Sequence, residues 1–357
     1  MATAHINQIA TATPPHDVHQ SYIAMTDQAL VDRRDRLIFK RMAARSGIQH
    51  RFSYFNPIVS DNTTTDTQGF YVRGQYPGTA ARMNFYEANA PTLALDAIAK
   101  LDFDREAITH IVVASCTGFV APGLDQIIVR EAGLPGSVER TVVGFMGCYA
   151  AVNALRLAHH FVRSEPAARV LVVNLELCTL HLQETQDMEK LLAMMLFGDG
   201  CAATLVTADP NGLALEDFRA INLPQSNELI TWRVGDQGFD MRLSGEVPQR
   251  ILAALQAEMV KNDTDGLLRG RRPEEFDGWA VHAGGRSILD AVEHGFGLGE
   301  HALQCSRAVL RDFGNMSSAT LMFVLQKMLG GAERVANGLA MAFGPGLAAE
   351  TFRFRHA

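Results

Sequence analysis

Residues 142–151 read VVGFMGCYAA, and they carry the clearest local signal in the chain. The stretch starts as an apolar strand, passes through glycine, and continues into an apolar pattern of helical period that ends near Pro166. Cys148 therefore falls at the start of a helix, where unpaired backbone N–H groups and the positive end of the helix dipole favour a thiolate over a thiol. The small neighbours Gly147 and Ala150 leave room for a substrate. The stretch predicts a nucleophilic cysteine, although a buried structural cysteine would show the same pattern.

Short apolar runs with the character of strands alternate with helical stretches along the chain. The runs lie at 111–114, 170–173, 202–206, 279–281 and 339–342. This alternation predicts an α/β architecture. A turn sequence, DPNG at 209–212, lies near the middle of the chain, so we expect two halves, 1–208 with the cysteine and 209–357. Each half has a strand that leads to a reactive-looking polar residue, but sequence identity alone does not establish a repeat.

The composition favours a large folded protein and disfavours several classes of partner. Of the 357 residues, 47% are hydrophobic and 20% are charged, which supplies enough apolar material for a large core. The chain has 32 basic and 39 acidic residues, a net charge of -7, and no stretch with enough Lys or Arg to follow a nucleic-acid backbone. The first residues lack the pattern of a signal peptide, and no window approaches roughly 18 uninterrupted apolar residues. These features predict a cytoplasmic protein with no integral membrane segment.

Five cysteines lie scattered at positions 116, 148, 178, 201 and 305. None belongs to a CxxC pair or to a Cys/His cluster with zinc spacing. We therefore expect neither structural disulfides nor a bound metal, and we expect most of these cysteines to be small buried hydrophobes.

Two further residues are candidates for catalysis. His282 follows the apolar run at 279–281 and precedes two glycines, which predicts an imidazole at a strand end with space around it, although a histidine satisfied in a turn would look the same. Asn315 lies in a Gly- and Ser-rich turn that opens a helix, where Asn is commonly a cap. A thiolate, an imidazole and an amide donor can together bind a thioester carbonyl and stabilise an enolate oxygen as charge develops.

Five segments, in this order, resemble the signatures of the chalcone synthase-like, or type III, polyketide synthases. They are the segments around Cys148, 193–203 with LFGDG inside it, His282, Asn315, and AFGPG at 342–346. The resemblance covers nearly the whole chain. Ketoacyl-ACP synthase III also uses Cys, His and Asn, but its asparagine motif and its C-terminal glycine run differ from those present here. Thiolases carry a second catalytic cysteine, and Cys305 lacks the glycine context for that role.

The resemblance implies a duplicated thiolase-like fold with five αβαβα layers, and a homodimer. It implies that Cys148 takes the acyl group from acyl-CoA, while His282 and Asn315 bind the malonyl thioester of malonyl-CoA and support its decarboxylation before carbon–carbon bond formation. By the same resemblance, His282 lowers the pKa of Cys148 by ion pairing, and Phe197 is an apolar wall that favours loss of the carboxylate. CoA thioesters are expected as substrates, and no cofactor is expected.

The segment 32–51 is rich in Arg and Lys and has apolar residues at helical spacing, which predicts an amphipathic helix with a basic face. In the resemblance, Arg41 and Arg45 match positions that hold the CoA phosphates. Ile38 replaces another basic position of the family, and Lys40 is the candidate to supply that contact. A solvated surface helix would show the same pattern.

The resemblance also supplies candidates for the lining of the substrate cavity. These are Thr117, Cys178, His181, Phe197, Ser317, Gly344 and Pro345. His181 stands at a position where plant relatives carry a small polar residue. In the cavity, its imidazole would occupy volume and offer a hydrogen bond to a chain carbonyl, and the alternative is a surface histidine after a strand.

The product depends on the volume and direction of this cavity, which the sequence shows only faintly. The stretch 232–248 is more similar to microbial alkylpyrone and alkylresorcinol synthases than to plant enzymes with aromatic starters, so we expect a fatty acyl-CoA starter extended with malonyl-CoA. Alternatives within the family are a product made from malonyl-CoA alone and a short or aromatic starter. Alternatives outside it are a fatty acid initiation enzyme similar to ketoacyl-ACP synthase III, and a non-catalytic partner that binds acyl chains.

Overall fold

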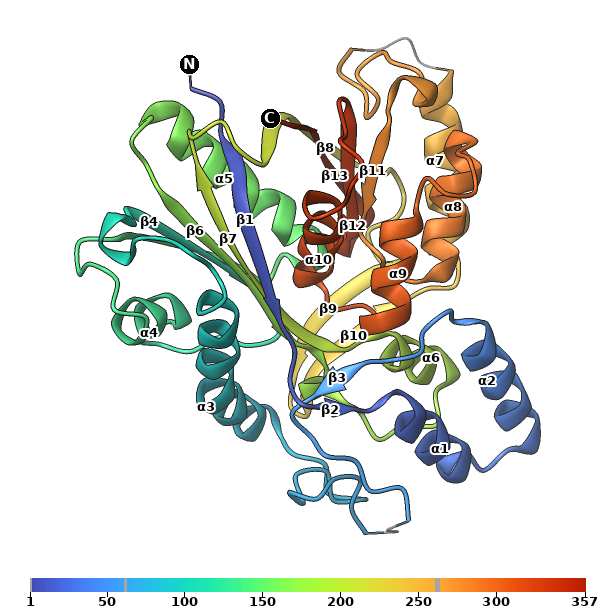
Figure 1. The fold of residues 1–357 in the computed structure, drawn as a ribbon. Helices are drawn as coiled ribbons and strands as arrows, with labels where there is room; N and C mark the ends of the chain where they lie inside the picture. The colour runs from blue at the N-terminus through green and yellow to red at the C-terminus, as the bar shows by residue number, and fades with distance from the viewer. Residues whose placement is uncertain (1, 61–62, 261–263) are drawn as a thin grey trace.

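A computed structural model of the chain describes residues 2–60, 63–260 and 264–357, and one nine-stranded sheet lies at its centre (Figure 1). The strands follow one another across the sheet in the order β11-β12-β13-β8-β1-β7-β6-β4-β5. Their bounds are β1 (His5–Ala12), β4 (His110–Ser115), β5 (Glu139–Gly144), β6 (Val170–Leu177), β7 (Asp199–Thr207), β8 (Leu213–Asn222), β11 (Gly278–Val281), β12 (Gly338–Gly344) and β13 (Ala348–His356). The five apolar runs predicted as strands lie within β4, β6, β7, β11 and β12, which confirms the α/β architecture.

The sheet contains the same four-strand arrangement twice. In the N-terminal half, β4 pairs parallel with β6, β6 antiparallel with β7, and β7 antiparallel with β1. In the C-terminal half, β11, β12, β13 and β8 repeat this order and these directions. β5 extends only the N-terminal half, and a short pairing of β1 with β8 joins the halves. Sequence identity does not reveal the repeat because the arrangement needs apolar residues at corresponding places, not the same residues.

Helices form the other layers (Figure 1). α3 (Thr79–Ile98) and α4 (Leu124–Glu131) pack on the outer face of the N-terminal half. α7 (Val247–Met259) and α8 (Arg286–Phe296) pack on that of the C-terminal half. α5 (Ala150–Ser164) and α10 (Ser318–Leu329) contact each other between the halves, and α9 (Gln304–Phe313) packs beside α10. The result is the duplicated αβαβα arrangement of a thiolase-like fold.

Burial on both faces explains why the strands read as apolar runs. In β4, Ile111 and Val113 belong to the core shared with α3, whereas Val112 and Ala114 belong to the core shared with α5. Successive side chains of a strand point to opposite faces, so a strand between two helical layers needs apolar residues at every position.

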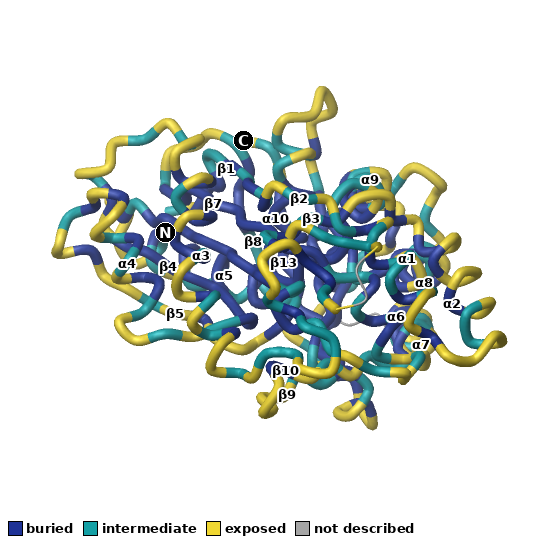
Figure 2. Tube along the Cα trace, turned by 90° about the horizontal axis from the view of Figure 1, so that it is seen from below, coloured by how far each residue is buried: buried dark blue, intermediate teal, exposed yellow. Residues whose placement is uncertain are grey.

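The remaining elements lie beside the sheet. They are α1 (His19–Ala29), α2 (Arg33–Arg45), α6 (Met188–Leu196), the pair β2 (His16–Asp17) and β3 (Phe52–Ser53), and the hairpin of β9 (Ile230–Gly235) and β10 (Gly238–Leu243). α2 is the predicted basic helix, and Asp32 caps it by accepting hydrogen bonds from the N–H groups of Arg34 and Asp35. Figure 2 shows α2 and β5 at opposite ends of the molecule.

Within the described ranges, none of the helices combines the length and hydropathy that a membrane span requires. In the same part of the chain, no group of three or more His, Cys, Asp or Glu side chains is arranged to hold a metal ion.

Candidate active site

Cys148 lies in a short 3₁₀ turn, Gly147–Tyr149, between β5 and α5, where the sequence predicts it. Its side chain is half-buried. Gly147 makes the turn possible because its φ is +76° and because a Cβ at this position would come within 2.5 Å of Cδ of Pro345. Pro345 directly follows β12, so the predicted C-terminal loop packs against the turn that carries Cys148.

His282 directly follows β11, where its backbone N–H donates a hydrogen bond to the carbonyl of Met341 over 2.8 Å. The residue is 1% exposed, and neither Nδ1 nor Nε2 has a hydrogen-bond partner among the described residues. Buried polar side chains are normally hydrogen-bonded. An unpaired imidazole that lines the same cavity as Cys148 is therefore available to a substrate.

Asn315 lies in the turn between α9 and α10, and two contacts orient its amide. Oδ1 accepts a hydrogen bond from the N–H of Ser317 over 2.9 Å, and Nδ2 donates to the carbonyl of Gly284 over 3.1 Å. Gly284 lies two residues after His282, so the amide is tied to the loop that carries the imidazole. Gly314 permits the turn because its φ is +68°.

Burial favours the neutral forms of the thiol and the imidazole. It raises the pKa of Cys148 to about 12, although hydrogen bonds with Ser317 and Asn315 oppose the shift. It lowers the pKa of His282 to about 3. A thiolate–imidazolium pair therefore requires both charges to form together, because either charge alone is disfavoured here. The pKa-lowering effect of His282 on Cys148 stays a prediction.

One small cavity brings the three predicted catalytic residues together. Cys148, His282 and Asn315 all line it, although they come from segments far apart in the chain. The other predicted site residues that line this cavity are Phe197, Ser317, Gly344 and Pro345. Phe197 is also joined to Asn315 by an isolated parallel β-bridge.

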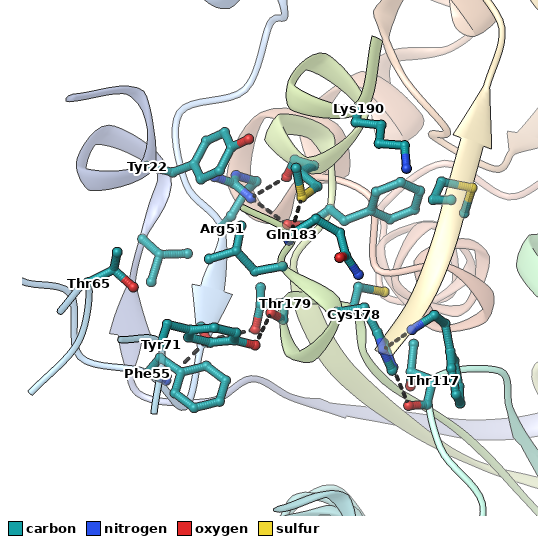
Figure 3. A pocket seen from close by; sticks show the side chains of 18 of the residues that line it. Tyr22, Arg51, Phe55, Thr65, Tyr71, Thr117, Cys178, Thr179, Gln183 and Lys190 are labelled. Carbon is teal, nitrogen blue, oxygen red and sulfur yellow. Dashed lines mark hydrogen bonds between the residues drawn. The ribbon is translucent and has the colours of Figure 1, made fainter. Parts of the chain in front are cut away.

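A longer, mostly apolar cavity adjoins the first (Figure 3). Five residues line both cavities, namely Cys116, Phe197, Trp232, Met241 and Ser317. The predicted residues Thr117, Cys178 and His181 line the longer one. In Figure 3, Thr117 and Cys178 lie at one end of the view, and Phe55, Thr65 and Tyr71 at the other. The two cavities meet at the five shared residues.

His181 is a buried cavity residue and not a surface histidine. Its Nε2 is 2.7 Å from the carbonyl of Thr117, and its Nδ1 accepts a hydrogen bond from the N–H of Phe239 over 3.0 Å. Both ring nitrogens are engaged by the backbone. The expectation that this imidazole offers a hydrogen bond to a chain carbonyl is therefore wrong.

Glu176 was not predicted as a site residue. It is fully buried in β6, where its carboxylate accepts hydrogen bonds from the N–H of Cys116 (3.0 Å), Oγ1 of Thr117 (2.9 Å) and Oγ of Ser318 (2.5 Å). Burial raises its pKa. The available signal was a single acidic residue inside an apolar strand, because such a residue needs polar partners.

Two domain models match almost the entire chain: chalcone and stilbene synthases, N-terminal domain, over residues 1–210, and the corresponding C-terminal domain over residues 216–357. The chain belongs to the chalcone and stilbene synthase family. It is a type III polyketide synthase and thus a condensing acyltransferase, which confirms the resemblance seen in the sequence.

Similar proteins cover nearly the full length of this type III polyketide synthase. The alpha-pyrone synthesis polyketide synthase-like Pks18 of Mycobacterium tuberculosis is 33% identical over 367 residues, which are 98% of this chain and 91% of Pks18. Bisdemethoxycurcumin synthase of Oryza sativa subsp. japonica is 32% identical and covers 96% of this chain and 90% of its own length. The crystal structure of PKS-I from the brown alga Ectocarpus siliculosus has a TM-score of 0.87 at 28% identity, with 100% of this chain and 99% of that one covered.

The three residues predicted to hold CoA in this type III polyketide synthase lie on α2, outside both cavities. Lys40 forms an ion pair with Asp27 of α1 over 2.8 Å. Arg41 and Arg45 are exposed, and neither side chain forms an ion pair with another described residue. Their contact with CoA stays a prediction.

Proposed function

We propose that this enzyme loads a fatty acyl group from acyl-CoA onto Cys148, extends it repeatedly with malonyl-CoA, and cyclises the chain to an alkylpyrone, an alkylresorcinol or a related product. The observation that carries the proposal is the long apolar cavity adjoining the Cys148 cavity. Its lining includes Tyr22, Met25, Phe55 and Met194, whose side chains suit an alkyl chain. The name of the mycobacterial relative supports a pyrone as the product.

In the loading step, the Cys148 thiol transfers its proton to His282 as the sulfur attacks the acyl-CoA carbonyl. The bond between that carbonyl and the CoA sulfur breaks, and CoA leaves as a thiol with the proton from the imidazolium. Coupling the transfer to the attack suits this site because burial disfavours an isolated charge on either group.

In the extension step, His282 and Asn315 donate hydrogen bonds to the malonyl thioester carbonyl. The bond to the carboxylate breaks, carbon dioxide leaves, and the enolate oxygen forms against these two donors. The enolate carbon then attacks the acyl thioester and releases the Cys148 sulfur. Phe197, at the junction of the two cavities, presents an apolar surface that favours loss of a charged carboxylate.

We also propose a homodimer through the free edge of β5. This strand ends the sheet, and large apolar side chains are exposed beside it. They are Phe119 (57% exposed), Val142 (56%), Phe145 (38%) and Met146 (36%). A second copy would cover both the edge and this apolar patch. Phe119 and Phe145 contact the ring of Phe239, which lines the longer cavity, so dimerisation would also support that wall.

Product analysis tests the proposed starter. The purified enzyme is given malonyl-CoA and a panel of starters from acetyl-CoA to long acyl-CoAs, with no carrier protein or cofactor, and products are identified by mass spectrometry. We expect pyrones or resorcinols with alkyl tails from the longer starters. Products from short or aromatic starters only would overturn the fatty acyl assignment. A strict need for acyl carrier protein would favour the fatty acid initiation alternative, and absence of any malonyl-CoA turnover would favour the acyl-binding partner.

A further inference from the structure

Arg51 is a buried arginine that lines the longer cavity (Figure 3). It ends the basic segment 32–51 of the sequence, but it lies beyond α2 and is only 2% exposed, so it takes no part in the helix face assigned to CoA. No carboxylate of the described residues lies within ion-pair distance of its guanidinium. Burial lowers its pKa to about 10, so the side chain is still charged at neutral pH. A buried charge of this kind needs hydrogen-bond acceptors for its N–H groups.

Protein groups satisfy only part of the guanidinium. Nε donates to Nδ1 of His19 over 3.0 Å. Nη1 donates to the carbonyls of Met194 (3.1 Å) and Phe197 (2.5 Å), at the C-terminal end of α6. Cζ lies 5.1 Å from the ring centroid of Tyr22, beside which Figure 3 shows it. Nη2 is buried and has no partner among the described residues, so its two N–H groups are free for a ligand.

This property is rare in the two cavities. Among the described residues that line either one, only His282 and Arg51 have a buried side-chain nitrogen or oxygen without a hydrogen-bond partner. His282 lies in the small cavity and is the proposed donor to the malonyl thioester. Arg51 lies in the longer one and is bonded to the backbone of Phe197, which lines both. Its free N–H groups therefore lie near the place where a chain attached to Cys148 passes from one cavity into the other.

We propose that Nη2 of Arg51 binds a keto oxygen of the growing polyketide chain. Each extension adds a keto group near the thioester end, whereas the alkyl tail of a starter carries no hydrogen-bond acceptor. A charged donor beside Phe197 therefore suits the extended part of the chain and not the tail. The malonyl carboxylate fits less well, because it leaves as carbon dioxide at His282 and Asn315, which do not line the longer cavity. The inference rests on the proposed extension at Cys148 and not on the choice of starter.

Starter discrimination by the parental enzyme is the first test, and it requires no variant. Acyl-CoA starters of equal length carry a ketone at C3, a ketone at C5 or no ketone, and kcat/KM is measured for each with malonyl-CoA. We expect a preference of about tenfold for at least one of the ketone starters, because a hydrogen bond from a charged group is among the strong ones. Equal kcat/KM for all three starters would overturn the proposal.

Arg51→Lys should remove this preference, because an ammonium group lacks the planar fork that reaches the α6 carbonyls and the chain together. Its polyketides should be shorter, while covalent loading of a saturated starter on Cys148 stays at the parental rate. Arg82→Lys is the matched control. Arg82 is also fully buried, bonds the carbonyls of Pro77 and Leu180 and has a buried Nη2 without a described partner, but it lines neither cavity. This control should keep both the preference and the product lengths.

Urea unfolding checks that both variants are folded, and the remaining outcomes separate a direct contact from an indirect one. Loss of loading together with extension in Arg51→Lys would mean that Arg51 acts only through the position of Phe197, which overturns the proposed contact. A parental ketone preference in Arg51→Lys, or its equal loss in Arg82→Lys, would overturn the contact as well. A parent that extends no starter would refute the proposed function itself, and this inference with it.

Discussion

His181 and Phe239 lie ring on ring, with centroids 4.1 Å apart and an interplanar angle of 12°, while the N–H of Phe239 donates to Nδ1 of the imidazole. Trp232 meets the same imidazole edge-on at 5.2 Å. Burial lowers the pKa of His181 to about 3, so the ring is neutral at working pH, with Nε2–H donating to Thr117. His181 therefore restricts the longer cavity in two ways. Its ring occupies volume, and its hydrogen bond with Phe239 holds β10, whose Phe239 also lines the cavity.

We expect His181→Ala to change the product distribution toward longer or differently cyclised polyketides. The substitution removes a ring that packs against both Phe239 and Trp232, and it leaves two backbone groups without their partner. The free energy of unfolding should fall by about 2–4 kcal/mol. Product mass spectrometry and urea unfolding measure the two effects. His159→Ala is the control, because His159 is a buried histidine outside both cavities, and it should lose stability without a product change. An unchanged product profile in His181→Ala would contradict the role.

Cys148→Ala should abolish covalent acyl loading and leave the fold intact, because the thiol is half-buried in a turn and its loss removes little packing. Intact-mass spectrometry after incubation with acyl-CoA detects the adduct directly. Cys178→Ala is the matched control, since Cys178 is another free cysteine, lines the adjoining longer cavity and should leave loading unchanged. An acyl adduct that persists in the Cys148→Ala protein would contradict the assignment of Cys148 as the acylated nucleophile.

Replacement of His282 or Asn315, the two proposed oxyanion donors, should slow malonyl-CoA decarboxylation by roughly 100-fold or more. The two variants should differ in stability. His282→Ala removes no side-chain hydrogen bond to a described residue. Asn315→Ala removes hydrogen bonds to Ser317 and Gly284, so its free energy of unfolding should be lower by about 1–2 kcal/mol. Carbon dioxide release and urea unfolding provide the readouts. Release at the parental rate in either variant would be incompatible with the proposed extension step.

The three candidate catalytic residues could be singled out from the sequence because their signals are local, and the structure brings them to one cavity. Cys148 follows Gly147 in a turn between a strand and a helix, and His282 directly follows a strand and is followed by Gly284 and Gly285. Asn315 stands in a turn before a helix. The partners of Glu176 could not be predicted, because Cys116 and Ser318 reach it from segments 60 and 142 positions away. The course of the longer cavity could not be predicted either, because its lining comes from segments far apart in the chain. The duplication of the fold appears in strand order and direction, which sequence identity does not record.

Asp199→Asn should remove a pH dependence of stability. Asp199 is buried, its two oxygens accept hydrogen bonds from N–H and Oγ1 of Thr179 at 2.8 and 2.7 Å, and burial raises its pKa to about 7. Because the folded pKa exceeds the unfolded value near 4, the carboxyl contributes most to stability below about pH 4, and the contribution is lost as the pH rises through about 7. At about pH 8 the free energy of unfolding of the variant should exceed that of the parent by a few kcal/mol. At about pH 5 this difference should be smaller. Denaturant unfolding of both proteins at the two pH values gives the comparison. The same difference in the free energy of unfolding at both pH values would refute the raised pKa of Asp199.

Gly147→Ala should inactivate the enzyme through the position of Cys148 and not through global unfolding. The added Cβ would meet Cδ of Pro345 at 2.5 Å, on a residue whose φ of +76° already disfavours a side chain, so the turn must shift relative to His282 and Asn315. A displacement of about 1 Å between reacting groups costs on the order of 100-fold in rate, and the strain should lower the free energy of unfolding by about 1–3 kcal/mol. Gly136→Ala is the control, because a Cβ there meets nothing within 4 Å. Acyl loading of Cys148 and product formation should fall together in Gly147→Ala and persist in Gly136→Ala. A parental kcat/KM in Gly147→Ala would show that the loop at Pro345 can move aside without displacing Cys148, and would contradict this prediction.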